Sequence, residues 1–549
     1  MQNISIKSVN YIKNKLVTIN SLLNQKRIII PFLLTFLYLL LYFIQDFSSQ
    51  SLIAHDEGLY ARRSRLVEES SNWFSSPFTK PHHKTIGSYW FIALSIRLFG
   101  NSELALRLPS IFFSFLCLIL TYLIALKITN KKSALISVLS LSSMPIWIQY
   151  SRYASPDFPY LFCILLVILF FLNFLDSTYY IGKYFYIFLS GFFISIAFFL
   201  RSYMVFVPLL GLIPFICFHL FRSKKRYSFL FITGIFFGSI PTLVNLSLSY
   251  RQFGLKGISV LFEFAKNQAI SGVLFQDSLY IPLQFIYLTF PIGIIFITLL
   301  VFTRPQSTIK YPLLTYYYPF LSLSILLFMS TTYPHYYLIL LPQFSIIFAN
   351  NIQSYKFRFS NSKISIRYLF LSLVIIIIFL LISLLIYYQL YLIDYPHRHT
   401  TIVYLSIFLL IISFLFSLRF LFDFGNRPFN LLNFFFTVIL SQYISISMLY
   451  NFGVIGSPNL SVKSFLNNSL VASISNSNTI YIFNADSKIQ TLLSYYLPSS
   501  KILKSSNDIF MYNYIITGDQ DLVYSGEMKS SFRIINTFKN HFLLMNIGK

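Results

Sequence analysis

The chain has 549 residues, of which 56% are hydrophobic and only 11% are charged. A soluble protein of this length needs far more charge to cover its surface, so the composition excludes an ordinary soluble enzyme. The net charge of +25 could indicate nucleic-acid binding, but the basic residues form short clusters between apolar runs, as in membrane proteins. We therefore expect a multi-pass α-helical membrane protein that contacts membrane lipids and no nucleic acid.

Apolar runs of about 20 residues, the length that crosses a bilayer core, recur along residues 1–450. The first of them is expected to be retained, because residues 45–51 contain no Ala-x-Ala cleavage site. The runs predict 13 membrane helices, near 28–46, 104–126, 133–151, 158–175, 184–200, 203–221, 228–250, 280–303, 311–330, 335–352, 368–393, 401–421 and 430–450.

The basic residues predict the orientation. With a cytoplasmic N-terminus, the inner segments hold 21 of the 42 Lys and Arg residues, the outer segments 13, and the C-terminal tail eight. This bias follows the positive-inside pattern. Ten of the 17 acids lie in outer segments, so any chemistry is expected on the outer face, and an odd number of spans places residues 451–549 outside as well.

The outer loop at 45–103 is expected to carry juxtamembrane helices and active-site residues. Residues 59–69 and 87–99 read as two helices lying on the membrane, the second ended by Gly100 and Asn101. A second long outer loop is expected at 251–279.

Residues 451–549 are rich in Ser, Asn, Lys and Asp, and predict a small soluble α/β domain. A strand is expected at 479–483 and a helix at 486–497, with Asp486 or Ser487 as its cap. Further strands are expected at 510–517 and 542–547.

The acid pair Asp56 and Glu57 follows the first apolar run almost directly. Carboxylates at a membrane edge are expensive to place, and a half-desolvated one suits a general base or a metal contact. Helix capping is the alternative.

A second outer-face acid, Asp157, reads as catalytic, or alternatively as a helix cap or a partner of Arg152. Cations on this face oppose the charge bias, and an anionic phosphate at the membrane surface would explain Lys80, Lys84 and Arg201, with lipid headgroups as the alternative. His82 and His83 are a weak metal signal. At the outer end of two later spans, His335 and Tyr336 could line a pocket.

These residues resemble motifs of the GT-C membrane glycosyltransferases, in the group of protein O-mannosyltransferases and lipid A aminoarabinose transferases (ArnT-like). The resemblance covers roughly the first 350 residues. The matching segments occur in the order Asp56-Glu57-x-x-Tyr60-Ala61, Asn72-Trp73, Lys84 to Trp90, Leu98-Phe99-Gly100, Arg107-Leu108-Pro109-Ser110, Ser151 to Asp157, Arg201-Ser202 and Tyr336 to Pro342.

The resemblance implies a GT-C fold and a hexosyl- or pentosyltransferase that moves a sugar from a polyprenyl-phosphate donor to an outward-facing lipid, glycan or protein acceptor. It implies that Asp56 is the base or orients the acceptor, and that Lys84, Arg201 and Tyr336 lie near the donor phosphate. In the aminoarabinose transferases a Glu beside the lysine binds metal; here this position is His83, which could bind zinc, magnesium or manganese.

The expected location is the plasma (inner) membrane of a prokaryote, with the C-terminal domain periplasmic or extracellular. The family has Lys-Pro and Lys-Gly where this chain has Lys84-Thr85 and Arg201-Ser202, and Lys80 is the lysine that precedes a proline. The rival functions are a lipid-linked-sugar flippase or transporter, which predicts charges at mid-membrane and repeat symmetry, and a non-catalytic membrane binding protein.

Overall fold

The computed structural model groups the chain into Met1–Phe47 and Ser48–Lys549, and every described residue lies in the second unit. The described residues are 51–53, 57–70, 72–269, 285–286, 288–293, 295–297, 303–304, 309–329, 333–354, 356–357, 408, 411, 434–451, 460–503, 505–538 and 540–547. The spans expected at 28–46 and 368–393 lie outside these residues, the span at 401–421 lies largely outside them, and the span at 280–303 is described in part.

Long apolar helices form the main body of this unit. Within the described ranges, four helical segments are long and apolar enough to cross a bilayer: Glu103–Ile128, Asp157–Asp176, Tyr180–Phe221 and Lys225–Phe253. They comprise α5 (Glu103–Ile128), α8 (Asp157–Asp176), α9 (Tyr180–Arg201) joined through the 3₁₀ turn η1 (Ser202–Val205) to α10 (Phe206–Phe221), and α11 (Lys225–Phe253).

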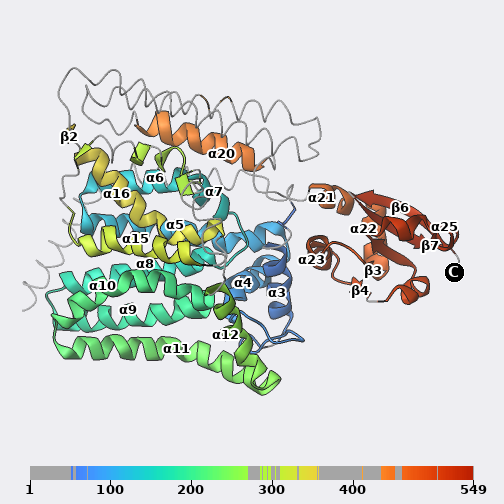
Figure 1. The fold of residues 1–549 in the computed structure, drawn as a ribbon, viewed down its shortest axis with the longest axis horizontal. Helices are drawn as coiled ribbons and strands as arrows, with labels where there is room; N and C mark the ends of the chain where they lie inside the picture. Colours follow the sequence, from blue (N-terminus) through green and yellow to red (C-terminus); the bar gives the residue numbers. More distant parts are fainter. Residues whose placement is uncertain are drawn as a thin grey trace, which may run out of the picture. The chain divides into compact units, whose positions relative to one another are not determined.

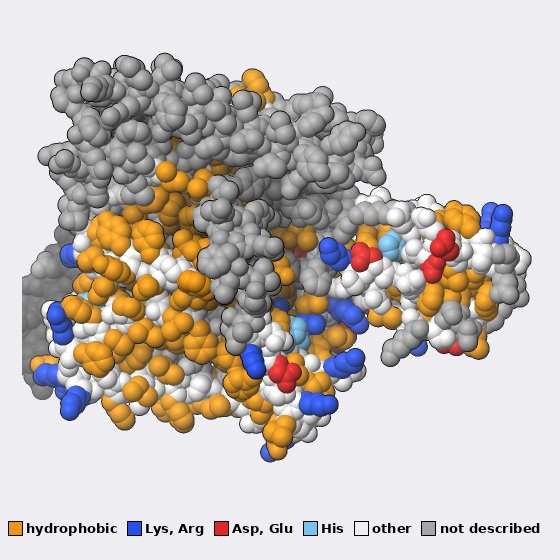
Figure 2. Space-filling model, viewed as in Figure 1, with side chains coloured by type: hydrophobic (Ala, Val, Ile, Leu, Met, Phe, Trp, Pro, Cys, Tyr) orange, Lys and Arg blue, Asp and Glu red, His pale blue; other side chains and the backbone are white. Residues whose placement is uncertain are grey.

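Helix α9 packs against both α8 and α11, and α5 packs against α8 (Figure 1). Hydrophobic side chains cover the visible face of these helices (Figure 2), and α11 exposes Phe229, Ile232 and Phe236. Such a surface requires a lipid environment, so the chain is a multi-pass membrane protein.

Three expected spans are not single regular α-helices in the structure: one breaks into two helices, and two change helix type along their length. The run at 133–151 divides into α6 (Lys131–Ser143) and α7 (Pro145–Tyr150), because Met144 is extended and Pro145 has no N–H to continue the first helix. The run at 311–330 begins with a π-helical segment, η2 (Leu313–Tyr317), and continues as α15 (Tyr318–Phe328). The run at 335–352 begins with a 3₁₀ segment, η3 (Pro334–Ile339), and continues as α16 (Leu341–Ser354). Hydropathy alone does not detect these changes of helix type.

Four shorter elements also belong to the described membrane part. The run at 430–450 appears as η5 (Phe435–Leu440) and α20 (Ser441–Asn451). Strands β1 (Thr303–Arg304) and β2 (Lys356–Phe357) pair antiparallel.

The two helices expected in the first outer loop are confirmed as α3 (Glu57–Glu69) and α4 (Gly87–Phe99), which pack against each other. Gly100 ends α4 at a φ of 80°, which only glycine adopts without strain, and its N–H donates to Ile96 O. The long loop expected at 251–279 is helical in its first part, where α12 (Lys256–Ala269) follows α11.

The C-terminal part is a small α/β domain, as the sequence predicts. Its five-stranded sheet has the order β4-β3-β5-β7-β6, with β3 parallel to β4 and β5, and with β7 antiparallel to both its neighbours. The elements are α21 (Leu460–Leu466), α22 (Ser469–Ser477), β3 (Ile480–Phe483), α23 (Ser487–Tyr496), β4 (Lys501–Ile502), η6 (Ser506–Met511), β5 (Tyr514–Thr517), α24 (Gln520–Tyr524), α25 (Gly526–Ser531), β6 (Phe532–Phe538) and β7 (His541–Asn546).

Most of the predicted elements of this domain are confirmed. Asp486 caps α23 by accepting from Lys488 N, and the strands expected at 479–483 and 542–547 are β3 and β7. The strand expected at 510–517 is wrong in its first half, where η6 reaches Met511. Strand β6 was not predicted; its burial does not alternate cleanly, because a register shift interrupts its pairing with β7.

Candidate active site

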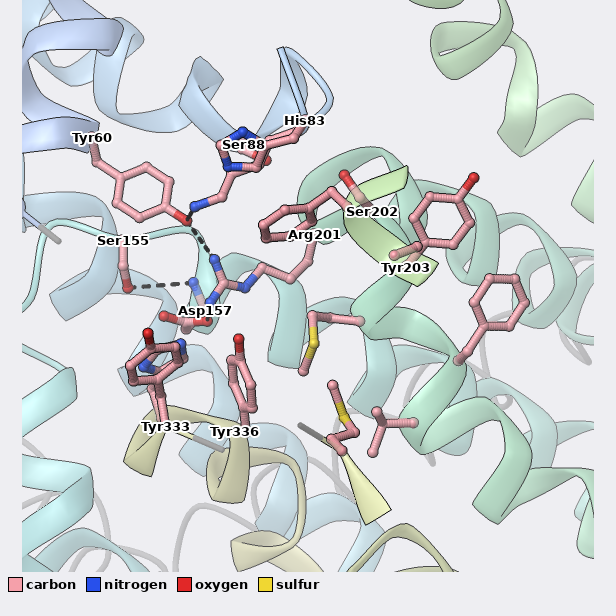
Figure 3. Close-up of a pocket in the computed structure, with 18 of the residues that line it drawn as sticks. Tyr60, His83, Ser88, Ser155, Asp157, Arg201, Ser202, Tyr203, Tyr333 and Tyr336 are labelled. Atoms are coloured by element: carbon pink, nitrogen blue, oxygen red, sulfur yellow. Dashed lines mark hydrogen bonds and ion pairs between the residues drawn. The ribbon is translucent and has the colours of Figure 1, made fainter. Parts of the chain in front are cut away.

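A cavity of about 550 Å³ lies where α3, the start of α8 and the α9–η1 turn meet (Figure 3). Its polar end is lined by Tyr60, Lys84, Asp157 and Arg201. Its apolar end is formed by side chains of η1, α10, α15 and the residue after it: Met204, Phe206, Val207, Leu210, Ile325 and Met329.

Two cations meet on one phenol oxygen at the polar end. Lys84 Nζ donates to Tyr60 Oη at 2.8 Å and lies 4.4 Å from the centre of the Tyr60 ring. The guanidinium of Arg201 donates to the same hydroxyl through Nη1, and its Nη2 lies 2.9 Å from Asp157 Oδ1. Figure 3 shows Tyr60 of α3, Asp157 of α8 and Arg201 of α9 pointing toward one another.

The backbone next to the two cations explains why they meet. Thr85 follows Lys84 and Ser202 follows Arg201; Thr85 N donates to Ser202 Oγ at 3.2 Å, and the two hydroxyls lie 3.1 Å apart. Thr85 Oγ1 also donates to Phe199 O at 2.7 Å, and Ser88 Oγ to Leu200 O at 2.8 Å. These bonds satisfy carbonyls that the end of α9 leaves open.

Close approach at this junction requires two unusual backbone positions. A Cβ at Gly87 would lie 2.4 Å from Phe199 O, so only glycine lets α4 reach α9 here. Ser202 has a φ of 52° and a ψ of −133°, a conformation that favours glycine. The hydrogen bonds with Thr85 hold the strained serine in this conformation.

The positive charge of Lys84 is less well neutralised by its neighbours than that of Arg201. Asp157 pairs with Arg201, whereas Lys84 forms no ion pair within the described segments. Burial, together with the nearby Arg201, lowers the pKa of Lys84 to about 8. An anionic group that entered this end of the cavity would favour the protonated amine.

The structure brings most of the predicted site residues together. Asp157, Lys84, Arg201, Tyr336 and His83 all line the cavity. The carboxylate of Asp157 pairs with Arg201 and not with Arg152, which the sequence analysis gave as its alternative partner. Lys80 is exposed and does not line the cavity, and Asp56 lies outside the described residues.

Glu57 has a different environment from the one expected for a reacting group. It is fully buried, and its carboxylate accepts from Arg107 Nε and Nη2, both at 2.9 Å, and from the backbone N–H groups of Ile53 and Ala154. It does not line the cavity. With every oxygen engaged, Glu57 joins α3 to α5 and to the loop before α8, and a structural role is the better interpretation.

Several residues of the cavity were not assigned a role from the sequence. Tyr60 was recognised only as part of a motif, yet it is the common acceptor for both cations. Tyr150, Tyr153 and Tyr333 add aromatic surface around His335 and Tyr336, and His335 lies 4.6 Å from Tyr336 between ring centres. Interfacial tyrosines are so common in membrane proteins that their number alone could not identify these.

The described residues do not fit the metal that the resemblance implies. No three His, Cys, Asp or Glu side chains in the described ranges could hold an ion together. His82 Nε2 accepts from Arg63 Nη1 at 3.1 Å and contacts the Tyr89 hydroxyl, while the His83 ring packs on Phe264 at 4.3 Å. The Arg63 guanidinium against the His82 imidazole opposes the binding of a cation at that ring.

The chain is similar to known proteins in part of its sequence and in its fold. Residues 83–245 match the model of the dolichyl-phosphate-mannose-protein mannosyltransferase family. ArnT from Cupriavidus metallidurans superimposes in its apo state with a TM-score of 0.70 at 14% identity, over 93% of this chain and 96% of ArnT. The structure of the same protein bound to undecaprenyl phosphate gives 0.71 at 13% identity, over 93% and 97%.

An uncharacterized protein of Aquifex aeolicus (strain VF5) is 31% identical over 138 residues, which is 25% of this chain and 28% of that relative's length. The chain thus has the fold of a GT-C membrane glycosyltransferase. More particularly, it has the ArnT fold and, over residues 83–245, the sequence pattern of the mannosyltransferase family, which confirms the resemblance predicted from its motifs.

Proposed function

We propose that this protein is a glycosyltransferase that takes a sugar from a polyprenyl-phosphate donor at the outer face of the plasma membrane and transfers it to a lipid, glycan or protein acceptor. The observation that carries the proposal is the convergence of Lys84 and Arg201 on Tyr60 Oη, at the polar end of a cavity whose other end is apolar.

The cavity matches the chemistry of such a donor. A prenyl phosphate has a compact anion on a long apolar chain, and the cavity pairs two cations with an apolar wall built by membrane helices. An anion is bound most strongly by charge-assisted hydrogen bonds, which Lys84 and Arg201 can both donate. That the structure of ArnT, which shares this fold, was determined with undecaprenyl phosphate is consistent with this donor class.

The reaction breaks the bond between the sugar and the phosphate oxygen and forms a bond from the sugar to the acceptor. Negative charge develops on the departing phosphate, and Lys84 and Arg201 stabilise it most when they are already in place. The Asp157 carboxylate, 2.9 Å from Arg201 Nη2, orients the guanidinium. Asp56 remains our proposed base or acceptor-orienting group.

The test is transfer and donor binding by purified protein in lipid nanodiscs. Lys84→Met and Arg201→Met should each weaken undecaprenyl phosphate binding by about tenfold or more and reduce transfer to surface acceptors. Lys80→Met decides between the two lysines and should change neither. Lys256→Met, which removes an exposed cation from α12, is the matched control.

Asp56→Asn should abolish transfer while the protein still inserts into the membrane, and full activity of that variant would disprove its role. Binding of undecaprenyl phosphate without any turnover would favour the flippase or a non-catalytic binding protein. Mass spectrometry of surface glycolipids and glycoproteins, with and without the gene, identifies the acceptor and the sugar.

A further inference from the structure

The C-terminal domain shares its hydrophobic core with the first outer loop. Leu52, Tyr60, Ala61 and Tyr89 belong to one continuous buried cluster with residues of the C-terminal domain, among them Val462, Phe465, Ile489, Leu492, Leu493 and Tyr495. Helix α3 approaches α23 closely, since a Cβ at Gly58 would lie 3.1 Å from Leu492 Cδ2. The domain is therefore part of the packing that supports α3.

Polar contacts at the end of α23 reinforce this packing. Arg65 on α3 is 8% exposed, and it donates through Nη1 to Tyr495 O at 2.7 Å and through Nη2 to Ser494 O at 3.3 Å. These carbonyls lie in the last turn of α23. The last carbonyl groups of a helix have no hydrogen-bond donor within the helix, and the helix dipole favours a positive charge there. Lys463 and Glu103 form a further ion pair between the domain and the start of α5.

Residues 51–53, just before α3, are held by hydrogen bonds from the C-terminal domain, from α3 and from α5. Tyr496 Oη accepts from Leu52 N at 2.9 Å, while Glu57 Oε2 accepts from Ile53 N at 2.9 Å and Arg107 Nη2 donates to Ser51 O at 3.3 Å. The Tyr496 hydroxyl also hydrogen-bonds the Glu103 carboxylate. A single phenol of the C-terminal domain thus connects the segment entering α3 with the start of α5.

We infer that Tyr496 and Arg65 are positioning residues for the donor site, because they hold α3 between the C-terminal domain on one side and Lys84 and Arg201 on the other. Tyr60 is 3% exposed and lies five residues before Arg65 on α3, so a shift of α3 moves the acceptor that both cations share. The inference rests on the proposed function and gives the C-terminal domain a role in it.

The experiment measures undecaprenyl phosphate binding to the full-length protein in nanodiscs, together with hydrogen exchange at Leu52 and along α3. Tyr496→Phe removes the acceptor of one buried hydrogen bond and should weaken binding about threefold to tenfold. Arg65→Met should weaken binding by at least as much, and Arg65→Lys, which can still donate to a carbonyl, should restore part of it. Tyr524→Phe is the matched control, since Tyr524 is 62% exposed in the same domain.

A purely structural role would lower thermal stability and amide protection while affinity stays at the wild-type value, and that result would overturn the inference. If the wild-type protein itself failed to bind undecaprenyl phosphate, the proposed function would fail instead. The expected result is weaker binding by both Tyr496→Phe and Arg65→Met, with faster exchange at Leu52 and with Tyr524→Phe unchanged.

Discussion

The environment of Lys84 predicts that donor binding depends on pH in a specific direction. Burial lowers the pKa of this amine to about 8 in the unliganded site. A bound phosphate favours the charged form, so the pKa is raised in the complex, and binding must take up a proton wherever the free amine is neutral. Affinity should therefore fall as the pH rises through 8.

The size of the effect follows from the fraction of protonated amine. With a pKa of about 8, roughly nine-tenths of the free amine is charged at pH 7 and roughly one-tenth at pH 9, which predicts an affinity loss of about tenfold. A phosphate monoester has its second pKa near 6, so its own charge changes little over this range. His83, whose pKa burial and Lys84 lower to about 4, is neutral throughout.

The assay is titration of undecaprenyl phosphate into nanodisc-embedded protein at half-unit steps from pH 6.5 to 9.5 (about seven points, enough to define one ionisation). Lys84→Arg keeps its charge at every pH, so its binding curve should be flat. Lys84→Met should bind weakly and equally at each pH. A wild-type curve that stays flat to pH 9.5, or an equal slope in Lys84→Met, would refute the assignment of Lys84 to the phosphate.

Three further predictions concern the groups around the site. Glu57→Gln breaks the buried ion pair with Arg107 and should destabilise the protein by about 3 kcal/mol, measured by thermal unfolding in detergent; unchanged stability would contradict its structural role. Gly87→Ala places a Cβ against Phe199 O and should lower the free energy of unfolding by about 1–3 kcal/mol. The control is Gly254→Ala: this glycine has open space around it but a φ of 63°, so any loss of stability there comes from backbone strain alone. Chelators such as EDTA should leave transfer unchanged, because the described donor set does not fit a metal; loss of activity that zinc restores would show that other residues complete a metal site.

The sequence alone determined the class of the protein and much of its local structure. Its long apolar runs and sparse charge require a membrane bundle, because unsatisfied backbone groups cannot face lipid. Helices α3, α4 and α23 followed from capping residues and periodicity, which act over a few residues. The sparse acids and outward cations also indicated Asp157, Lys84 and Arg201 as residues of one site.

Only the tertiary structure decided which of these groups meet. The sequence motifs already favoured Asp56 over Glu57 as the acceptor-facing carboxylate, but only the packing of α5 shows that the partner of Glu57 is Arg107. Lys84 rather than Lys80 reaches the cavity because Thr85 bonds to Ser202, 117 residues later in the chain. The support of α3 by Tyr496, 444 residues after Leu52, likewise depends on contacts between distant segments, which no local pattern encodes.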